Sequence, residues 1–238
     1  MGQSHTSRDF ETELRELRSH LLAMGARCER SVQLALRAFI ESSDDVAGEV
    51  KALDRRIDRD EMEIDELALR VLALRQPVAH DLRLLATALK LVTDLERIGD
   101  EAVNITERAE EGGLETRQLP HPHLKEMADL VQQMLRDALD AFVEEDVPRA
   151  ERVRHGDDAV DDLYGRTLRE MQEYMSKHPD KIPPAMRVVS VAKYLERIAD
   201  HATNLAEEII FMVVGDDVRH EKLGIPSQFP PPPDAGTP

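Results

Sequence analysis

The chain has 238 residues, of which 41% are hydrophobic and 33% are charged, which is enough apolar material for one large or two modest globular domains. Its 48 acidic residues outnumber its 31 basic residues and give a net charge of −17, which argues against a nucleic-acid partner held by phosphate contacts. Aromatic residues make up only 3% and tryptophan is absent, while straight-chain residues, which lose little rotamer freedom in a helix, are abundant. The composition therefore predicts an all-α protein.

Several features predict a cytoplasmic location. The single cysteine, Cys28, cannot form an internal disulfide and fits a reducing compartment. The N-terminal segment 1–9 is polar and lacks the apolar core of a secretory signal. The longest apolar run, 209–214, is far shorter than the ~18 residues that a membrane-spanning helix needs. We therefore expect the protein to reach a membrane only through a partner.

Apolar residues recur at helical spacing through most of the chain and predict six long helices. The boundaries come from residues that favour helix ends. Asp146-Val147-Pro148 is typical of an N-cap followed by proline in the first turn, whereas Gly112-Gly113 and Gly215 are typical of helix ends. The second of the expected helices begins after an N-cap at 42–45 and ends at about 74. The other five span about 9–40, 79–110, 123–144, 147–177 and 184–213.

The chain contains an internal repeat. The segment 95–105 aligns without gaps with 195–205, a shift of 100 residues, and most positions are identical. In the preceding helices we align Asp65 with Asp161, a shift of 96 residues. The repeat predicts two tandem antiparallel three-helix bundles, with domains at 1–113 and 120–214. The remaining segment, 215–238, is rich in proline and is expected to be a disordered tail.

Acidic side chains share one face of each repeated helix. Because a four-residue step turns an α-helix by only ~40°, Glu96, Asp100 and Asn104 lie on one face, opposite the apolar stripe. The same argument places Glu61 and Asp65 beside the core stripe of the preceding helix. These acids either form an ordinary solvated face or meet across a surface groove between adjacent helices. Carboxylates gathered in a groove repel one another unless they are protonated or bridged by cations.

The second repeat offers a similar set of acids, and we expect the two grooves to differ because the shift of 96 residues gives Asp54 and Asp58 no acidic counterparts. All-oxygen ligation suits divalent cations or iron. His201, next to Asp200, is a candidate for a further metal ligand or for a phosphoryl acceptor. An exposed histidine beside an acid more commonly has neither role. The candidate metal ligands are Glu61, Asp65, Glu96 and Asp100 in the first repeat and Asp157, Asp161, Glu196 and Asp200 in the second.

These residues carry a resemblance to a known family. The segment 10–14, the run 75–83 and both Leu-Glu-Arg-Ile-x-Asp segments are similar to the PhoU family of phosphate-signalling regulators. The resemblance implies two three-helix bundles, acidic motifs that hold surface metal clusters in some members, and homodimers or larger homo-oligomers. It also implies a cytoplasmic negative regulator of the phosphate-starvation response that bridges the ATPase subunit of a phosphate ABC transporter and a phosphate-sensing histidine kinase.

The sequence favours an adaptor over an enzyme. It has no glycine-rich phosphate loop, no serine, histidine and aspartate nucleophile pattern and no Cys-x-x-Cys motif. The competing hypothesis is a metal-dependent phosphohydrolase that uses the carboxylate grooves, because clustered cations can activate water.

Overall fold

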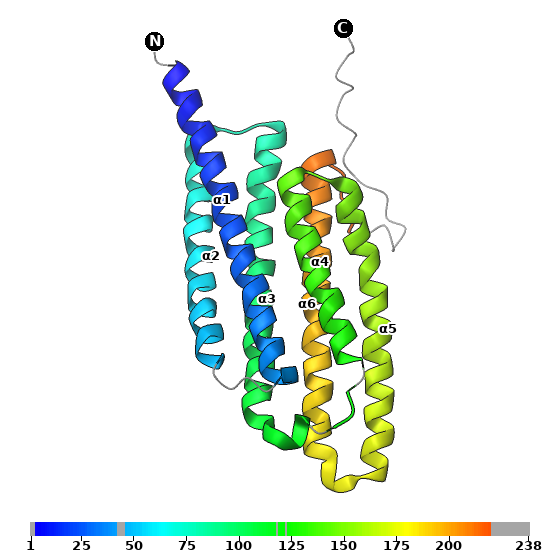
Figure 1. Ribbon diagram of the computed structural model, residues 1–238. Coiled ribbons are helices and arrows are strands. Elements are labelled where there is room, and N and C mark those ends of the chain that lie inside the picture. Colours follow the sequence, from blue (N-terminus) through cyan, green and yellow to red (C-terminus); the bar gives the residue numbers. More distant parts are fainter. Residues whose placement is uncertain (1–2, 42–45, 118, 122, 220–238) are drawn as a thin grey trace.

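The computed structural model describes residues 3–41, 46–117, 119–121 and 123–219 (Figure 1). These residues form helices and turns and no strand, so the prediction of an all-α protein with six long helices is confirmed. The elements are α1 (Gln3–Leu36), a π-helical turn η1 (Arg37–Glu41), α2 (Ala47–Arg75), α3 (Ala79–Arg117), α4 (Leu124–Glu144), α5 (Val147–Lys177), a 3-10 turn η2 (Pro179–Lys181) and α6 (Ile182–Val214).

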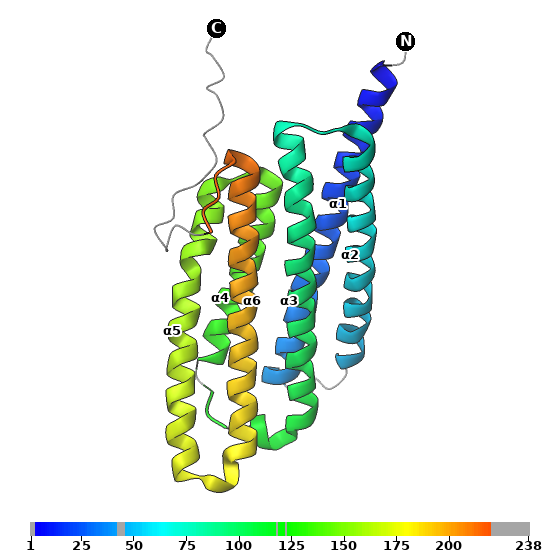
Figure 2. The ribbon, with the colours of Figure 1, turned by 180° about the vertical axis from the view of Figure 1, so that it is seen from behind.

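The long helices form two layers. Figures 1 and 2 show α2, α3, α6 and α5 side by side in a row, with α1 and α4 on one face of it. Helix α1 packs against α2 and α3, and α4 packs against α5 and α6, so each set of three is a bundle. The two bundles meet mainly along α3 and α6, which occupy the centre of the row.

The hydrophobic core runs without interruption through both bundles. Helix α1 buries a stripe that includes Leu17, Met24 and Cys28, all fully inaccessible to solvent, at the spacing that a helix needs to present one apolar face. The thiol of Cys28 donates a hydrogen bond to the carbonyl oxygen of Leu95 on α3, at 3.1 Å. Since apolar area removed from water is the main driving force for folding, the shared core holds the two bundles together.

Two expected helix ends are confirmed by their local geometry. The backbone N–H of Arg149 donates to Asp146 Oδ1 at 3.0 Å, which is the N-cap predicted for α5. Gly215 ends α6 with φ at +80°, and its N–H donates to the carbonyl oxygen of Phe211 at 2.8 Å. The cap expected at 42–45 lies outside the described residues, and Val46 precedes α2 without a side-chain capping hydrogen bond.

The expected end of the third helix is wrong. Helix α3 continues through Gly112 to Arg117, although each glycine in a helix interior costs about 1 kcal/mol relative to alanine. The extra turn carries Thr116, which is only 2% exposed, and leads into Leu119, which is 6% exposed. Burial of the Leu119 side chain offsets the low helix propensity of the glycines, whereas the buried hydroxyl of Thr116 finds no hydrogen-bond partner among the described residues.

The described part of the chain includes no helix that is both long enough and apolar enough to cross a membrane. Part of the expected tail packs against the helices: Val218 is buried, and its carbonyl oxygen accepts a hydrogen bond from Arg154. Residues 220–238 lie outside the described residues. The domain limits at 1–113 and 120–214 stay a prediction.

Candidate functional site

The four acids predicted for the first groove lie on two neighbouring helices. Glu61 and Asp65 are on α2, and Glu96 and Asp100 are on α3. All four are partly exposed at the surface, and the side chains of Glu96 and Asp100 retain 22% and 47% of their accessible area. The position of these acids outside the core agrees with the helical spacing of the sequence.

Three of these acids come together across the two helices, since Glu61 on α2 interacts with Glu96 and Asp100 on α3, whereas Asp65 interacts with Glu61 of its own helix. Burial raises the pKa of Glu96, and the charges of Asp100 and Glu61 raise it further. Burial also raises the pKa of Glu61, with Asp65 as the next largest cause. Because a neighbouring like charge disfavours ionisation, the native structure holds these carboxylates less ionised than free side chains would be.

Two further acids belong to this groove. Burial raises the pKa of Asp54, and the charges of Asp58 and Asp100 add to the effect. Asp58 in turn raises the pKa of Asp100, after the larger effect of burial. Asp54 and Asp58 lie four residues apart on α2, and both interact with acids of α3. The six acids Asp54, Asp58, Glu61, Asp65, Glu96 and Asp100 are named the first groove.

Two nearby arginines partly offset the charge of the first groove, Arg55 beside Asp54 and Arg97 beside Glu96 and Asp100. Arg97 Nε lies 3.6 Å from Glu96 Oε2, and Arg97 Nη1 lies 3.7 Å from Asp100 Oδ2. The Arg97 side chain is 59% exposed, and ion pairs of this kind in high dielectric contribute little. The first groove therefore retains a strong negative charge.

The burial pattern corrects the register of the repeat. Each residue that α5 buries lies 103 positions after a residue that α2 buries, as Val160 lies after Ile57. The shift of 96 residues expected from the acidic motifs is therefore wrong for these helices, and the counterparts of Asp157 and Asp161 are Asp54 and Asp58. The matched buried sets are Ala47, Val50, Ile57, Asp60, Ile64 and Ala68 on α2, and Ala150, Val153, Val160, Leu163, Thr167 and Met171 on α5.

The second groove contains Asp157, Asp161, Glu196 and Asp200, on α5 and α6. Burial raises the pKa of Asp200, and the charges of Glu196 and Asp161 add to the effect, so three of these acids come together. Lys193 Nζ lies 2.5 Å from both carboxylate oxygens of Glu196. The close lysine distinguishes the second groove from the first.

Neither groove is a preformed metal site. Within the described ranges, no three histidine, cysteine, aspartate or glutamate side chains are placed to hold one metal ion. The donor chemistry fits, since carboxylate oxygens are the ligands that divalent cations prefer, but the side chains would have to turn to form a coordination sphere. Metal binding by these eight acids stays a prediction.

His201 makes a contact that joins the two bundles. Its Nδ1 lies 2.8 Å from Oδ1 of Asp94 on α3, and the side-chain amide of Asn204 donates to the same oxygen at 3.1 Å. An ion pair across the bundles also links Arg197 on α6 to Glu101 on α3 at 3.2 Å. His201 therefore has a structural partner outside the second groove.

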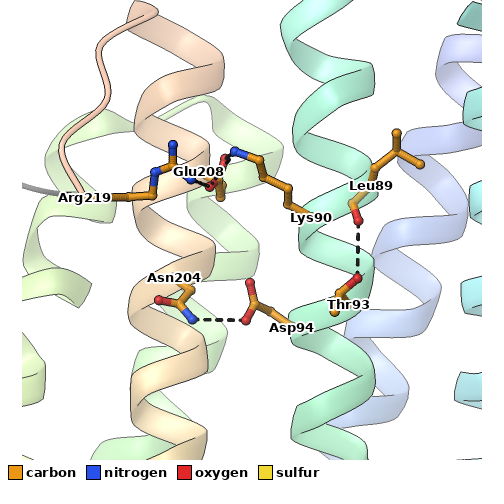
Figure 3. Close-up of a pocket in the computed structure, with 7 residues that line it drawn as sticks. All are labelled: Leu89, Lys90, Thr93, Asp94, Asn204, Glu208 and Arg219. Atoms are coloured by element: carbon orange, nitrogen blue, oxygen red, sulfur yellow. Dashed lines mark hydrogen bonds and ion pairs between the residues drawn. The ribbon is translucent and has the colours of Figure 1, made fainter. Parts of the chain in front are cut away.

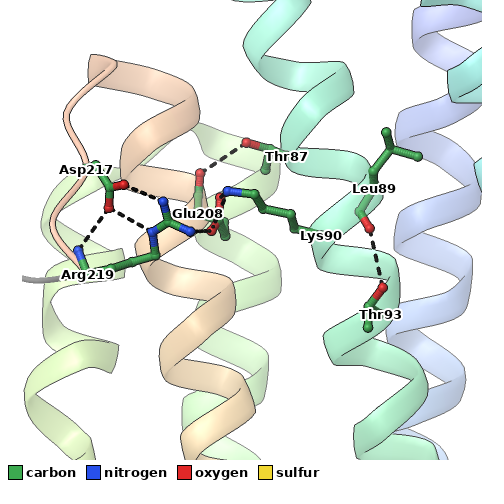
Figure 4. Close-up of polar contacts among 7 residues, drawn as sticks. All are labelled: Thr87, Leu89, Lys90, Thr93, Glu208, Asp217 and Arg219. Carbon is green, nitrogen blue, oxygen red and sulfur yellow. Dashed lines mark hydrogen bonds and ion pairs between the residues drawn. The ribbon is translucent and has the colours of Figure 1, made fainter. Parts of the chain in front are cut away.

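A cavity of about 390 Å³ lies between α3 and α6, and Asp94 and Asn204 form part of its lining (Figure 3). Glu208, only 5% exposed, accepts hydrogen bonds from Lys90 on α3 at 2.9 and 3.0 Å. Arg219, beyond the end of α6, donates to the same carboxylate at 3.2 Å, and the hydroxyl of Thr87 donates to the backbone oxygen of Glu208 (Figure 4). This cluster cannot be predicted from local sequence patterns, because Lys90 and Glu208 are 118 positions apart.

Arg83 fixes one end of the junction between the bundles. Its Nε donates to the backbone oxygen of Met212 at 2.9 Å, and its Nη2 donates to that of Val213 at 3.3 Å. The last carbonyl groups of a helix have no partner within the helix, so an arginine of the first bundle satisfies the end of α6. These polar contacts, together with those of His201, Arg197 and Glu208, are called the α3–α6 seam below.

Comparison with known proteins places this architecture in a family. The sequence profile of a family described as "PhoU domain" matches residues 21–109 and again 124–209, once in each bundle. The chain belongs to the PhoU family. This agrees with the resemblance seen in the sequence motifs.

Relatives of this PhoU chain match it over most of its length. A Pseudomonas putida protein named phosphate-specific transport system accessory protein PhoU homolog is 44% identical over 223 residues, which cover 92% of this chain and 86% of the relative. The crystal structure of PhoU from Pseudomonas aeruginosa aligns with a TM-score of 0.80 at 40% identity, covering 86% of this chain and 98% of the other. The phosphate transport system regulatory protein PhoU from Streptococcus pneumoniae aligns with a TM-score of 0.80 at 27% identity, covering 88% and 99%.

Proposed function

We propose that this PhoU chain is an accessory regulator of phosphate transport that represses the phosphate-starvation response when phosphate is plentiful. The observation that carries the proposal is the match to phosphate-specific transport system accessory proteins over nine-tenths of the chain, with 44% and 42% identity for two Pseudomonas relatives. The finer proposal is an adaptor in the cytoplasm that contacts the ATPase subunit of a phosphate ABC transporter and a phosphate-sensing histidine kinase. It acts as a homodimer or larger homo-oligomer.

The shape of the molecule supports an adaptor. The two bundles are similar in fold, yet their outer surfaces differ in charge, since the first groove has six acids, whereas the second has four acids and a lysine that pairs with Glu196. Unlike surfaces on one rigid body allow two different partners to bind at once. A membrane-bound transporter would supply the contact with the membrane.

We also propose that the carboxylate grooves bind divalent cations or iron, with a structural or modulatory role. Support comes from the raised pKa of Glu96, which burial causes first and like charge second. A bound cation would relieve both the repulsion and the cost of burying charge. The ligands would be Glu61, Asp65, Glu96 and Asp100 with Asp54 and Asp58 nearby, and Asp157, Asp161, Glu196 and Asp200 in the second bundle.

Deletion of the gene tests the regulatory function. We expect phosphate-starvation genes to be expressed in high phosphate in the deletion strain, and the wild-type gene to restore repression. Unchanged expression in the deletion strain would refute the proposal.

Activity measurements separate this function from the competing phosphohydrolase. The purified protein, loaded with Mn²⁺ or Mg²⁺, is expected not to hydrolyse phosphomonoesters. Hydrolysis that is lost in a Glu96→Ala and Glu196→Ala double variant would favour the enzyme instead. Elemental analysis of protein purified without a metal-affinity tag tests the metal sites: an absence of bound metal together with no thermal stabilisation by added divalent cations would refute them.

A further inference from the structure

Two large apolar side chains on α2 are exposed to solvent. Met62 is 63% exposed and Leu69 is 57% exposed, and their spacing of seven residues puts them on one stripe about 10 Å apart along the helix. Helix α2 forms an outer edge of the row and packs against α1 and α3 (Figures 1 and 2). The stripe faces away from the buried residues of α2, because Ile57 and Ile64 lie on the opposite side of the helix.

The other edge helix does not carry such a stripe. In the corrected register, Gly165 and Gln172 on α5 are the counterparts of Met62 and Leu69. The fold therefore does not require large apolar residues at these positions. Their presence in the first bundle alone points to a contact that only this bundle makes.

Acids of the first groove border the stripe directly. Asp58 is four residues before Met62, and Asp65 is four residues before Leu69, so each exposed apolar side chain has a groove carboxylate about 40° away on the helix. The first groove continues from these acids to Glu96 and Asp100 on α3. The surface is thus apolar along the stripe and strongly negative on the side that faces α3. On its other side the stripe is bordered by the exposed Arg55, Arg59 and Arg70 together with Glu66.

This combination selects the chemistry of the occupant. A complementary partner presents apolar side chains to Met62 and Leu69 and positive charges to the first groove. Anionic lipid headgroups would be repelled by the same carboxylates, and so would the acidic surface of a second copy, since the chain carries a net charge of −17.

We propose that the stripe of Met62 and Leu69, with the first groove beside it, is the docking surface for a basic amphipathic helix of a partner protein. The proposal deepens the adaptor function and rests on it for the identity of the partner. Binding of such a helix and binding of cations in the first groove are mutually exclusive, because both use the same carboxylates.

A binding measurement with a defined probe tests the surface. The probe is a fluorescent synthetic helix with leucine on one face and lysine on the other, and its anisotropy is followed with metal-free, full-length protein. We expect the Met62→Gln and Leu69→Gln double variant to bind the probe about tenfold more weakly or worse, as expected for loss of central apolar anchors. The matched control is Ile182→Gln with Met186→Gln, which removes two apolar side chains of similar exposure, 43% and 48%, from α6, and it should bind as the wild type does.

Further results bear on the proposal. Added Mn²⁺ should displace the probe, and a version of the probe with glutamate in place of lysine should not bind. Equal weakening in both double variants, or no weakening in either, would overturn the docking surface. A changed oligomeric state in the Met62 and Leu69 variant by analytical ultracentrifugation would assign the stripe to self-association instead, and wild-type binding to anionic vesicles that the variant loses would assign it to a membrane.

A reporter strain distinguishes failure of this inference from failure of the proposed function. If the deletion strain is derepressed, the Met62 and Leu69 variant should fail to restore repression while the control variant restores it. A deletion strain without derepression would refute the regulatory function, and the probe measurement would still decide whether the surface binds a basic helix.

Discussion

Gly99 and its neighbour Ile57 offer a sharp test of how the first bundle is packed. A Cβ added at Gly99 would lie 3.1 Å from Ile57 Cδ1 and 3.4 Å from Ile57 Cγ2. At the equivalent positions the second bundle has Ala199 and Val160, both fully buried. The second bundle thus pairs the larger Ala199 on α6 with the smaller Val160 on α5, because valine lacks the Cδ1 atom of isoleucine.

The expected free energies of unfolding follow from these contacts. Gly99→Ala gains about 1 kcal/mol of helix propensity, but overpacking against a fully buried isoleucine costs about 1–3 kcal/mol, so the single variant should be no more stable than the wild type. Ile57→Val alone should cost about 0.5–1.5 kcal/mol. In the double variant the new Cβ fills the space left by Cδ1, and its stability should equal or exceed that of the wild type by up to about 1 kcal/mol.

Urea denaturation followed by circular dichroism measures the coupling. The double-mutant cycle should show a favourable interaction of about 0.5–4.5 kcal/mol, because the two changes share one contact. The Ala199→Gly variant is a control for helix propensity without a clash, and it should destabilise the protein by about 1 kcal/mol or more. Effects of Gly99→Ala and Ile57→Val that simply add would refute the packing argument.

Three further predictions concern the caps, the thiol and the carboxylates. Asp146→Ala should lower the free energy of unfolding by about 1 kcal/mol, because the N–H of Arg149 loses its cap; an unchanged denaturation midpoint would contradict this. Burial strongly raises the pKa of the Cys28 thiol, so a disulfide reagent should label it in urea and leave the native protein unmodified, whereas fast native labelling would show that α1 opens. Burial and the charge of Asp100 raise the pKa of Glu96 above its ordinary value of 4.5. The folded state therefore binds the Glu96 proton more tightly than the unfolded state does, and it loses stability as the pH rises from 4.5 through the raised pKa. The metal-free Glu96→Gln variant should therefore melt at a higher temperature than the wild type at neutral pH, with the difference vanishing in acid; a lower melting temperature at neutral pH would refute this.

Local signals in the sequence were sufficient to predict most helix ends. Asp146 with its following proline, and Gly215, act through their own backbone geometry, so their roles can be recognised without tertiary information. The end expected at Gly112 and Gly113 is wrong because Thr116 and Leu119 bury side chains beyond it. Packing of this kind depends on the partner surface and is invisible in local propensity.

The acids could be found from sequence, but their pairing between repeats could not. The motif around Asp65 is similar to that around Asp161, and similarity of short acidic motifs misled the alignment of α2 with α5. Burial depends on the whole bundle, and it makes Val160 on α5 the counterpart of Ile57 on α2, which gives the register. Sequence also gave no indication of the ion pair between Lys90 and Glu208, since residues far apart in the chain leave no periodic pattern.

The α3–α6 seam also sets the distance between whatever binds to the two bundles. Arg83 holds the end of α6 against the first bundle. Further along the same boundary, Arg197 pairs with Glu101 and Glu208 pairs with Lys90. When one region of a partner protein binds one bundle, another region of the same partner meets the second bundle at a high effective concentration. Loosening the seam would lower that effective concentration and weaken two-site binding without touching a single residue of either contact surface.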